Sequence, residues 1–542
     1  MPVRRSPSCT SSTMSGRSRS CATMEIRGSS ALTSWSGTTS WMRFWTSSAR
    51  TSLPIAMIWR TFVPRWMSCP AACSSAGCSV SLAEMVERGK RLEASVFAVE
   101  AKQAHDLVKD NKYGCSVLLG DDGIIDTAYY PGRFKRIYCD RENGVPFYLP
   151  SQMTDIYPKA DKYISKLTKC DIDELKLKEK TLLLTRSGTI GSISLVSKTI
   201  LGTVFSDDVI RVTFKNDYDL GYAYTYLKSK VGNTILQTNG YGSVITHLEP
   251  EHLSETPIPN APIEIRKKIH NLIMESYALR DESNALIDQA QALLVKELNL
   301  PPISEIKVDT LDESKSVQTF NVKLSEMAGR ADASYHVPIV DAIVDILKKN
   351  AAEVTTVGDE RISSDVVLPG RFKRVYVDKE YGVKFIGGKE MHQLIPTTEK
   401  YLSKKAHKKQ LEGSLGIKPY SILTPARGSL GDVELPCKHF YSWAISDNMM
   451  QILSNKNACG YLYIFLNSEY GKALIQRFTY GGVVDAIEPF HIQSVEVPIL
   501  RNQDVQKQIN NLALQANEKR YQAYLLEQEA LKVLDEEVIY AE

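Results

Sequence analysis

Two long stretches of the chain carry apolar or small residues at an alternating three- and four-residue spacing. Such a spacing keeps one stripe on one face of an α-helix and is typical of a seam between helices. The first stretch, 265–298, contains neither Gly nor Pro, and Pro301-Pro302 ends it because proline cannot continue a helix. The pattern predicts a long helix whose seam residues are Ile269, Leu272, Ser276, Leu279, Ser283, Leu286, Ala290 and Leu293.

The same pattern returns 240 residues later in the chain. Only Lys519 is charged among the matching positions, which are Ile509, Leu512, Ala516, Lys519, Ala523, Leu526, Ala530 and Val533. Two helices with matched seams are expected to pack on each other. Ser276 and Ser283 correspond to Ala516 and Ala523, so both helices are small at these levels and close approach is predicted there.

The segments that precede the two helices are also copies of each other, at an offset of 238 to 240 residues. This offset indicates a tandem duplication of a large module, because the repeats of a solenoid are far shorter. The matching landmarks are Pro131–Arg136 and Pro369–Arg374, Arg186–Gly191 and Ala426–Gly431, Ser206-Asp207 and Ser446-Asp447, Tyr222 and Tyr461, Leu227 and Leu466, Ser229 and Ser468, Gly232 and Gly471, Tyr241-Gly242 and Tyr480-Gly481, Glu249 and Glu488, and His252 and His491.

Each module mixes strands and helices, which predicts an α/β (α+β) fold. Short apolar runs at 181–185 and 420–424 lead into Gly-rich turns, and 208–214 alternates like a half-buried strand. Short helices are expected at 222–230 and 461–470. The predicted parts are a first module at 81–261, a helix at 262–300, a linker at 301–320, a second module at 321–501 and a second helix at 502–542.

Residues 1–80 differ in composition from the rest. They hold nine Arg, one acidic residue (Glu25) and five of the six Trp, but no Lys, His or Tyr, and no apolar period persists in them. Three interpretations stay open: a basic tail that touches DNA phosphates, a zinc site at Cys69, Cys73 and Cys78, and a segment without a selected fold, translated from an upstream or shifted reading frame. The zinc site lacks a fourth nearby Cys or His.

The chain of 542 residues is long enough for several domains, and its 43% hydrophobic content is ordinary for a soluble protein. No apolar stretch suits a membrane span, and the amino terminus makes a poor signal peptide, so a cytoplasmic protein with reduced thiols is expected. The net charge of +3 is carried by residues 1–80, and the remainder is net acidic. Nucleic-acid binding would therefore depend on local basic patches.

The clearest basic patch is the turn that both modules share. Arg133, Lys135 and Arg136 surround Phe134 in the first copy, and the second copy repeats them as Arg371, Lys373 and Arg374. A Pro-Gly start predicts that the turn presents these side chains outward, where they suit phosphates. Contact with a partner protein and a duplicated solvated loop are the alternatives. If the modules recognise different DNA sequences, base specificity is expected instead from the stretches 146–180 and 384–418, because the two modules differ there.

Two further loops are candidates for DNA contact. The Gly turns could bring backbone amides close to a phosphate, although a tight strand connection explains them equally well. The Tyr-Gly loops could be flexible loops that face DNA, and an ordinary structural loop is the equally weighted alternative. The histidines that follow the Glu-Pro pairs are interpreted as structural. The candidates in these loops are Arg186, Ser187, Thr189, Tyr241 and Ser243 in the first module and Arg427, Ser429 and Tyr480 in the second.

Catalytic motifs are missing from the sequence. It has no Gly-x-x-x-x-Gly-Lys-(Ser/Thr) phosphate loop and no (Asn/Asp)-Pro-Pro-(Tyr/Phe) stretch of amino-methyltransferases. A faint nuclease-like pattern at 309–315 lies in the linker and does not recur, and the cysteines of 81–542 are too isolated for a metal site. A non-enzymatic protein is expected, and an interaction scaffold that does not recognise DNA is the second hypothesis.

The ordered set of motifs, found twice, resembles the DNA-specificity (S) subunit of type I restriction-modification systems. It comprises Arg-x-(Asp/Glu)-Ala-Ser, a strand into Gly-x-x-Gly, Ser-Asp, Tyr-x-Tyr-x-x-Leu-x-Ser, Glu-Pro and a long Ile-x-x-Leu helix. The resemblance covers roughly 81–542. The chain departs from the family pattern in two places. The first copy has Glu93 where the second has Asp332, and residues 1–80 have no counterpart in the family.

This resemblance implies that each module is a target recognition domain for one half of a split site in double-stranded DNA. It implies that the two helices pair antiparallel as a coiled coil, hold the modules apart and dock two methyltransferase subunits, with restriction/translocase subunits joining the complex. S-adenosylmethionine, ATP and Mg would then be bound by those partners, with no cofactor or metal on this chain.

Overall fold

The computed structural model describes residues 80–87, 94–242, 245–306, 308, 319–396 and 399–541. The predicted extension up to Ser79, the candidate Ser243, the departure at Glu93 and the pattern at 309–315 lie outside the described residues. The short helix α2 (Leu82–Glu87) belongs to a different compact unit from the residues that follow Gly89. The description below concerns the second unit.

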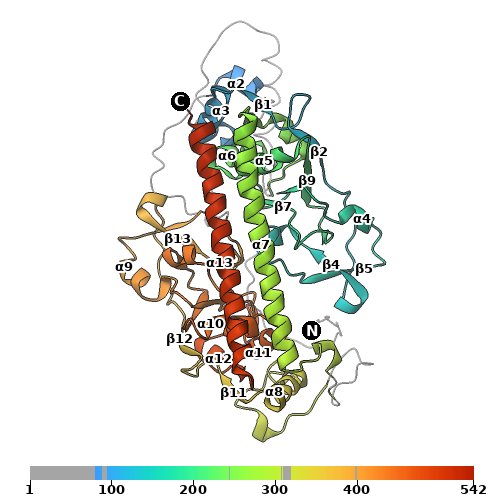
Figure 1. Ribbon diagram of the computed structural model, residues 1–542, viewed down its shortest axis with the longest axis vertical. Helices are drawn as coiled ribbons and strands as arrows, with labels where there is room; N and C mark the ends of the chain where they lie inside the picture. Colours follow the sequence, from blue (N-terminus) through green and yellow to red (C-terminus); the bar gives the residue numbers. More distant parts are fainter. Residues whose placement is uncertain are drawn as a thin grey trace, which may run out of the picture. The chain divides into compact units, whose positions relative to one another are not determined.

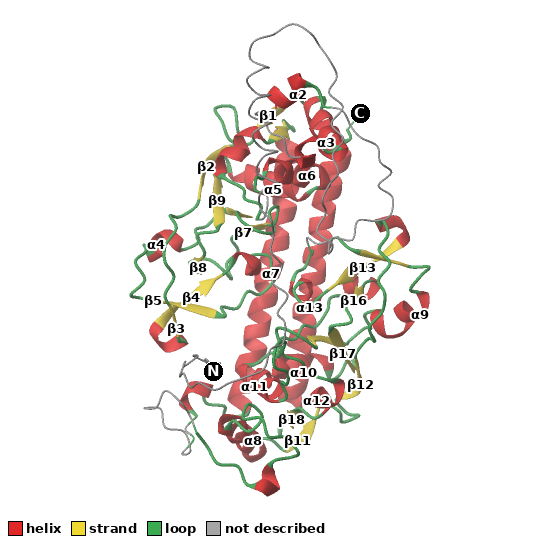
Figure 2. Ribbon diagram, turned by 180° about the vertical axis from the view of Figure 1, so that it is seen from behind, coloured by secondary structure: helices red, strands yellow, loops and turns green. Residues whose placement is uncertain are grey.

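Two long helices, α7 (Ile263–Glu297) and α13 (Gln503–Leu534), lie side by side through this unit, green and red in Figure 1 and again adjacent in Figure 2. They run antiparallel, because residues later in α7 contact residues earlier in α13. Ser276 Oγ donates to the carbonyl of Ala523 at 2.8 Å, whereas Glu282 pairs with Lys519 at 2.5 Å. The predicted antiparallel pairing is confirmed, and so is the close approach at Ser276.

The buried seam of α7 is displaced by one residue from the predicted leucine positions. Leu272, Leu279, Leu286 and Leu293 are half-buried at the flank of the pair and pack against the module cores. On α13, the predicted Ile509, Leu512 and Val533 are buried, whereas Leu526 is half-buried. The buried residues of α7 that follow the helical spacing are Ile269, Ile273, Ser276, Ser283, Ile287, Ala290 and Leu294.

On α13 the seam contains charged residues that an apolar pattern leaves out. Arg520 and Glu527 of α13 are 2% and 1% exposed. Arg520 Nε donates to Ser283 Oγ at 3.3 Å, and Glu527 pairs with Arg280 of α7. A buried charge is tolerated when it is paired and hydrogen-bonded. A stripe that avoids charge therefore selects Leu526 instead of the adjacent Glu527.

The first module contains two sheets of four strands. The first sheet is antiparallel and follows the order β2-β9-β6-β7. The second follows β3-β5-β4-β8, with β4 and β8 parallel. The strands are β1 (Cys115–Val117), β2 (Ile125–Tyr129), β3 (Tyr138–Cys139), β4 (Gly144–Tyr148), β5 (Lys162–Ser165), β6 (Leu182–Thr185), β7 (Ile193–Leu195), β8 (Val204–Phe205), β9 (Val209–Phe214) and β10 (Pro257–Pro259), which pairs with β1; the helices are α3 (Val99–Lys109), α4 (Ile172–Leu175), α5 (Asp217–Lys228) and α6 (Lys230–Asn239).

The second module repeats this topology with sheets β12-β17-β15 and β14-β13-β16, and β13 is again parallel to β16. The strands predicted in both modules and the mixed α/β class are confirmed. The strands are β11 (Glu353–Thr356), β12 (Ser363–Val367), β13 (Gly382–Ile386), β14 (Tyr401–Ser403), β15 (Ile422–Pro425), β16 (Ala444–Ile445), β17 (Met449–Ser454) and β18 (Glu496–Ile499), which pairs with β11; the helices are α8 (Pro338–Asn350), α9 (Lys408–Gln410), α10 (Cys459–Leu466), α11 (Glu469–Arg477) and α12 (Pro489–Gln493).

Several duplicated landmarks anchor the modules to the helix pair. Helix α5 packs on α7 at Gly221, where a Cβ would lie 2.6 Å from the Cα of His270. Helix α10 packs on α13 at Gly460, where a Cβ would lie 2.4 Å from the carbonyl oxygen of Asn510. Glycine at these positions lets the backbones approach, so each module is fixed to its own long helix.

The two modules also touch each other near the middle of the helix pair. The Ile156 N–H donates to the carbonyl of His392 at 2.9 Å, and Asp155 bridges Gln393. His392 Nδ1 lies 3.3 Å from Glu434, which Arg520 Nη1 contacts at 2.8 Å. This junction therefore links the first module, the second module and α13 through buried charges.

The junction predicts that stability depends on pH. Burial raises the pKa of Asp155 to about 7, although the nearby charge of His392 acts to lower it. Burial opposes the charge of His392, but its hydrogen bond to Glu434 gives it a raised pKa. Between about pH 4 and 7 the folded chain holds a proton on Asp155 that the unfolded chain releases, so stability falls as pH rises. The His392 contribution is present below about pH 6.5 and is lost as pH rises through its folded pKa.

We expect the midpoint of thermal unfolding to fall between pH 5 and pH 8, and Asp155→Asn to reduce that slope. The exposed Asp122 provides a matched control, since Asp122→Asn should keep the wild-type slope. Calorimetry at four pH values measures both. A midpoint that rises over this range, or an undiminished slope in Asp155→Asn, would contradict the prediction.

Candidate nucleic-acid interface

The basic turn of the first module is clamped to the Ser-Asp motif. Arg133 and Lys135 are exposed and form no ion pair with any described residue. Arg136 folds back, and its Nη2 lies 2.6 Å from Asp207 and 3.3 Å from Asp208. Burial opposes its charge, but Asp207 leaves Arg136 with a raised pKa. The prediction of an outward side chain is therefore wrong for Arg136, because adjacent carboxylates hold it.

The second module repeats the clamp with the same residue types. Arg374 pairs with Asp447, and its guanidinium lies over the Phe385 ring at 5.3 Å. Arg371 and Lys373 are exposed, like their counterparts in the first module. Two motifs that are about 70 residues apart in sequence thus form one structural unit in each module. The clamp fixes the turn and leaves two cations facing solvent.

A loop that differs between the modules is fastened beside each turn. In the second module the Ser403 N–H donates to the carbonyl of Val375 at 2.9 Å, and His407 Nε2 accepts from the Val375 N–H at 3.0 Å. In the first module the Ser165 N–H donates to the carbonyl of Ile137 at 2.8 Å. Both loops lie within the stretches that were predicted to carry specificity.

The side chains of these two loops are unlike each other. The second loop exposes four lysines, Lys404, Lys405, Lys408 and Lys409. The first exposes Lys166 and Lys169 on either side of Leu167, which is 81% exposed. A common scaffold therefore presents different groups next to an identical basic turn.

The Gly turn and the Tyr-Gly loop of the first module meet at Glu249. Arg186 is buried, and its Nη2 lies 2.5 Å from Glu249 Oε1, while Nη1 lies 3.6 Å from Asp208. The Tyr241 hydroxyl donates to Glu249 at 2.7 Å. Burial opposes ionisation of Glu249, but these two hydrogen bonds lower its pKa. Since Asp208 also touches Arg136, one polar network joins the basic turn, the Gly turn and the Tyr loop.

The second module has the same Tyr–Glu contact, but its arginine stands one position later in the motif. The Tyr480 hydroxyl donates to Glu488 at 2.6 Å, and Arg427 lies 4.0 Å from that carboxylate. Arg427 aligns with Ser187, whereas Ala426 takes the place of Arg186. The Arg427 side chain is 35% exposed, whereas the Arg186 side chain is 7% exposed. The second module therefore presents at the surface a guanidinium that the first module buries.

The histidines after Glu-Pro are structural, as predicted. His252 Nδ1 accepts from the backbone N–H of Glu249 at 2.9 Å, and His491 Nδ1 accepts from that of Glu488 at 3.2 Å. These bonds cap short helical turns and fix the backbone of the glutamates. Glu249 and Glu488 themselves were noted only as repeat landmarks, and the repeat was the signal that they share a role.

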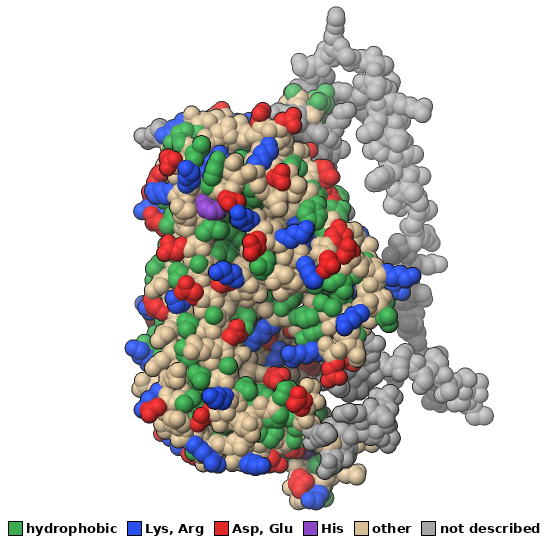
Figure 3. All heavy atoms as spheres, turned by 45° about the vertical axis from the view of Figure 1, so that its right-hand side comes forward, with side chains coloured by type: hydrophobic (Ala, Val, Ile, Leu, Met, Phe, Trp, Pro, Cys, Tyr) green, Lys and Arg blue, Asp and Glu red, His purple; other side chains and the backbone are tan. Residues whose placement is uncertain are grey.

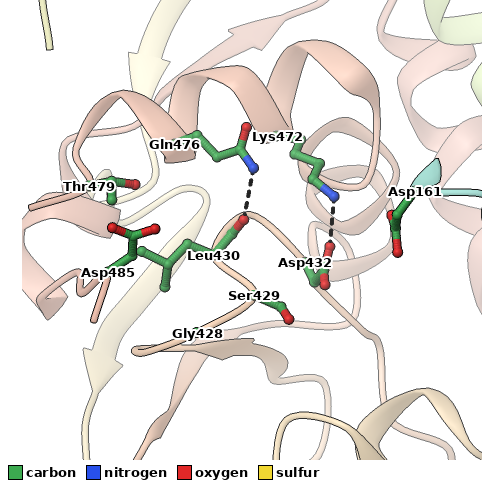
Figure 4. A pocket seen from close by; sticks show the side chains of 9 residues that line it. All are labelled: Asp161, Gly428, Ser429, Leu430, Asp432, Lys472, Gln476, Thr479 and Asp485. Atoms are coloured by element: carbon green, nitrogen blue, oxygen red, sulfur yellow. Dashed lines mark hydrogen bonds and ion pairs between the residues drawn. The ribbon is translucent and has the colours of Figure 1, made fainter. Parts of the chain in front are cut away.

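The tips of the Gly turns expose Thr189 and Ser429. Ser429 borders a pocket of about 310 Å³, shown in Figure 4, which also receives Asp161 of the first module. Lys472 is paired with Asp432 at 2.9 Å inside this pocket. Its lining contains three carboxylates and one lysine, so the pocket disfavours a phosphate. The remaining lining residues are Gly428, Leu430, Gln476, Thr479 and Asp485.

Charges of both signs are interspersed on the face in Figure 3. Any electropositive surface there is local, as the weak net charge indicates. Within the described ranges, no three His, Cys, Asp or Glu side chains gather into a possible metal-binding group. None of the helices described combines the length and the apolar character that a membrane crossing requires.

Comparison with protein families matches residues 132–289 to the type I restriction modification DNA specificity domain. Comparison with curated proteins gives no match. Among solved structures, the S subunit of a type I restriction-modification system from M. genitalium is 12% identical, over 77% of this chain and 98% of that chain, with a TM-score of 0.28. The HsdS subunit from Thermoanaerobacter tengcongensis is also 12% identical, with the same coverage and a TM-score of 0.24. The chain therefore carries, at residues 132–289, the DNA specificity domain of type I restriction-modification systems, as its ordered motifs predicted.

Proposed function

We propose that this chain is the non-catalytic specificity subunit of a type I restriction-modification complex and recognises a bipartite, asymmetric DNA site. Each module, 81–261 and 321–501, serves as a target recognition domain for one half-site. The single observation that carries this proposal is the basic turn, held by the same Arg–Asp clamp in both modules and placed beside a loop that differs. Identical cations suit phosphates, and different neighbours suit different bases.

The helices 262–300 and 502–542 act as the spacer between the modules in this proposal, with 301–320 as the linker. Helix α7 has 35 residues and spans about 50 Å at about 1.5 Å per residue. That length exceeds one turn of DNA, so the half-sites are separated by bases that are not recognised. The helix pair also docks two methyltransferase subunits, and restriction/translocase subunits complete the complex. Those partners bind S-adenosylmethionine, ATP and Mg, in the cytoplasm.

Methylome sequencing of cells with and without this chain tests the function directly. A modified bipartite motif that disappears with the gene supports the proposal and gives the target. The scaffold hypothesis predicts a different result in competition binding with the methyltransferase partner at stated salt. Equal affinity for all duplexes would support a scaffold, whereas discrimination of one sequence supports recognition.

Charge removal at the shared turn gives a quantitative prediction. We expect Arg371→Gln with Lys373→Gln to weaken binding to all duplexes and to reduce the slope of log K against log salt by about 2, one for each phosphate contact. Salt titrations of the assembled complex measure this slope. Lys296→Gln with Lys532→Gln removes two exposed cations from the long helices and should leave the slope unchanged. An unaltered slope in the turn variant would contradict phosphate contact.

A further inference from the structure

The two ends of each Tyr-Gly loop are joined by backbone hydrogen bonds. In the first module, Tyr241 and His247 exchange two backbone hydrogen bonds of 2.9 and 2.7 Å. In the second, Tyr480 and Ala486 exchange bonds of 3.0 and 2.8 Å. The tyrosine hydroxyls are fixed by the glutamates described above. The two hairpins therefore share one stem, anchored by side chain and backbone.

A glycine in each hairpin is required by the fold of the turn. Gly242 and Gly481 have φ values of +109° and +115°. A Cβ at these positions would lie 2.3 Å from the carbonyl oxygen of Ile245 and 2.4 Å from that of Val484. L-residues avoid this region and this contact, so both modules retain glycine where the chain folds back.

Among the described residues of the two loops, three apolar side chains are exposed. Ile245 is 55% exposed and Val484, at the same position of the second hairpin, is 57% exposed. Val483 is 100% exposed. Leaving such side chains in water forgoes the stabilisation that burial provides. The same choice at the tip of the same hairpin in two diverged modules indicates that the exposed group has a function.

The surroundings of the tips are polar. The Gly188 N–H donates to the carbonyl of Thr246 at 3.1 Å, and the Gly428 N–H donates to that of Asp485 at 3.2 Å, so each tip stands beside a Gly turn. Arg427 lies at the stem of the second hairpin. The core of a protein–protein interface is a desolvated patch rich in apolar and aromatic groups, whereas a wedge into DNA needs one apolar side chain on a rigid arm among groups that bind the backbone.

We propose that the two hairpin tips are DNA wedges: Ile245 and Val483-Val484 insert between stacked bases, one in each half-site. This inference rests on the proposed function. The wedge offsets the cost of partial unstacking with apolar contact. The modules differ next to the tip, where Thr246 is replaced by Asp485. A carboxylate repels phosphates but accepts a hydrogen bond from the amino group of guanine in the minor groove, the groove from which apolar wedges enter, so the two wedges favour different base steps.

The test uses the full chain with its methyltransferase partner and duplexes that carry 2-aminopurine at successive positions of the target. The fluorescence of 2-aminopurine rises when its base unstacks. With the wild-type chain we expect a rise at one step in each half-site. Val483→Ser with Val484→Ser should abolish the rise in one half-site and weaken specific binding about tenfold or more. Ile245→Ser should do the same in the other half-site.

The controls separate a wedge from other roles. Val484→Ile keeps the apolar character and should keep the rise, and Val99→Ser, on a side chain of α3 that is 53% exposed, should change neither signal. Unchanged fluorescence and affinity in the hairpin variants would overturn the wedge while sequence recognition stands. Loss of methyltransferase assembly in those variants, before DNA is added, would overturn it in favour of a protein contact. Equal wild-type affinity for all duplexes would overturn the proposed function together with the wedge.

Discussion

Glu527→Ala should destabilise the folded chain by about 3–5 kcal/mol, because it leaves two cations buried without a counter-charge. Glu527 is 1% exposed on α13. It pairs with Arg280 of α7 and, at 2.9 Å, with Lys228 of α5, and it accepts from the Tyr224 hydroxyl at 2.9 Å. Burial opposes its ionisation, but Lys228 and Arg280 lower its pKa. One carboxylate therefore joins both long helices and the first module.

Denaturant unfolding of the wild type and variant gives the difference in free energy. Glu529 is exposed two residues further along the same helix, so Glu529→Ala matches the change in charge and helix propensity without the buried cations. We expect that control to stay within about 0.5 kcal/mol of the wild type. A loss below about 1 kcal/mol in Glu527→Ala would show that water reaches Arg280 and Lys228 and that the network is not closed.

The charged residues of the seam mark the limit of what the apolar pattern could predict. The pattern located both helices, and the match between them predicted the pairing. It selected Ser283 correctly but chose Leu286 and Leu293 for the seam, whereas the structure buries Ile287 and Leu294 there. Periodicity fixes the face of a helix only to about the angle between adjacent residues. Here the deciding side chains were Arg520 and Glu527, whose partners lie far away in sequence.

The candidate interface was predictable to a similar degree. The repeat identified both basic turns, and Arg133 and Lys135 are exposed as expected. Sequence alone gave Arg136 and Arg186 the same role as those two. The structure holds Arg136 against Asp207 and buries Arg186 against Glu249. Carboxylates from distant strands and loops decide which arginine of a motif remains free of an ion pair. The sequence does not show which carboxylates lie close to each arginine, so the structure was needed to distinguish them.

Adding one heptad to both long helices should lengthen the spacer of the recognised site or abolish binding. Insertion after Ile287 in α7 and after Ala516 in α13 places the new turns at one level of the pair, since both residues lie in the core of the second module. Seven residues add about 10 Å of helix, which corresponds to about three base pairs. A heptad barely rotates the helix, whereas three base pairs turn the second half-site by about 100° around the DNA axis. Binding survives only if the modules can follow that rotation.

The junction between the modules opposes such an insertion, because the Ile156–His392 hydrogen bond spans the level that is lengthened. Stability should therefore fall in the double insertion. A heptad in α7 alone should cost more, since α7 beyond Ile287 would lose its register with α13 before Ala516, although Ser276–Ala523 and Glu282–Lys519 would keep their partners. A heptad placed in the linker 301–320 leaves the seam intact and should preserve the spacer. Methylome sequencing reports the spacer in each strain. An unchanged spacer with the double insertion would show that the helices do not set the distance between half-sites, and the modules would then have to measure it through their own contact at Asp155 and His392.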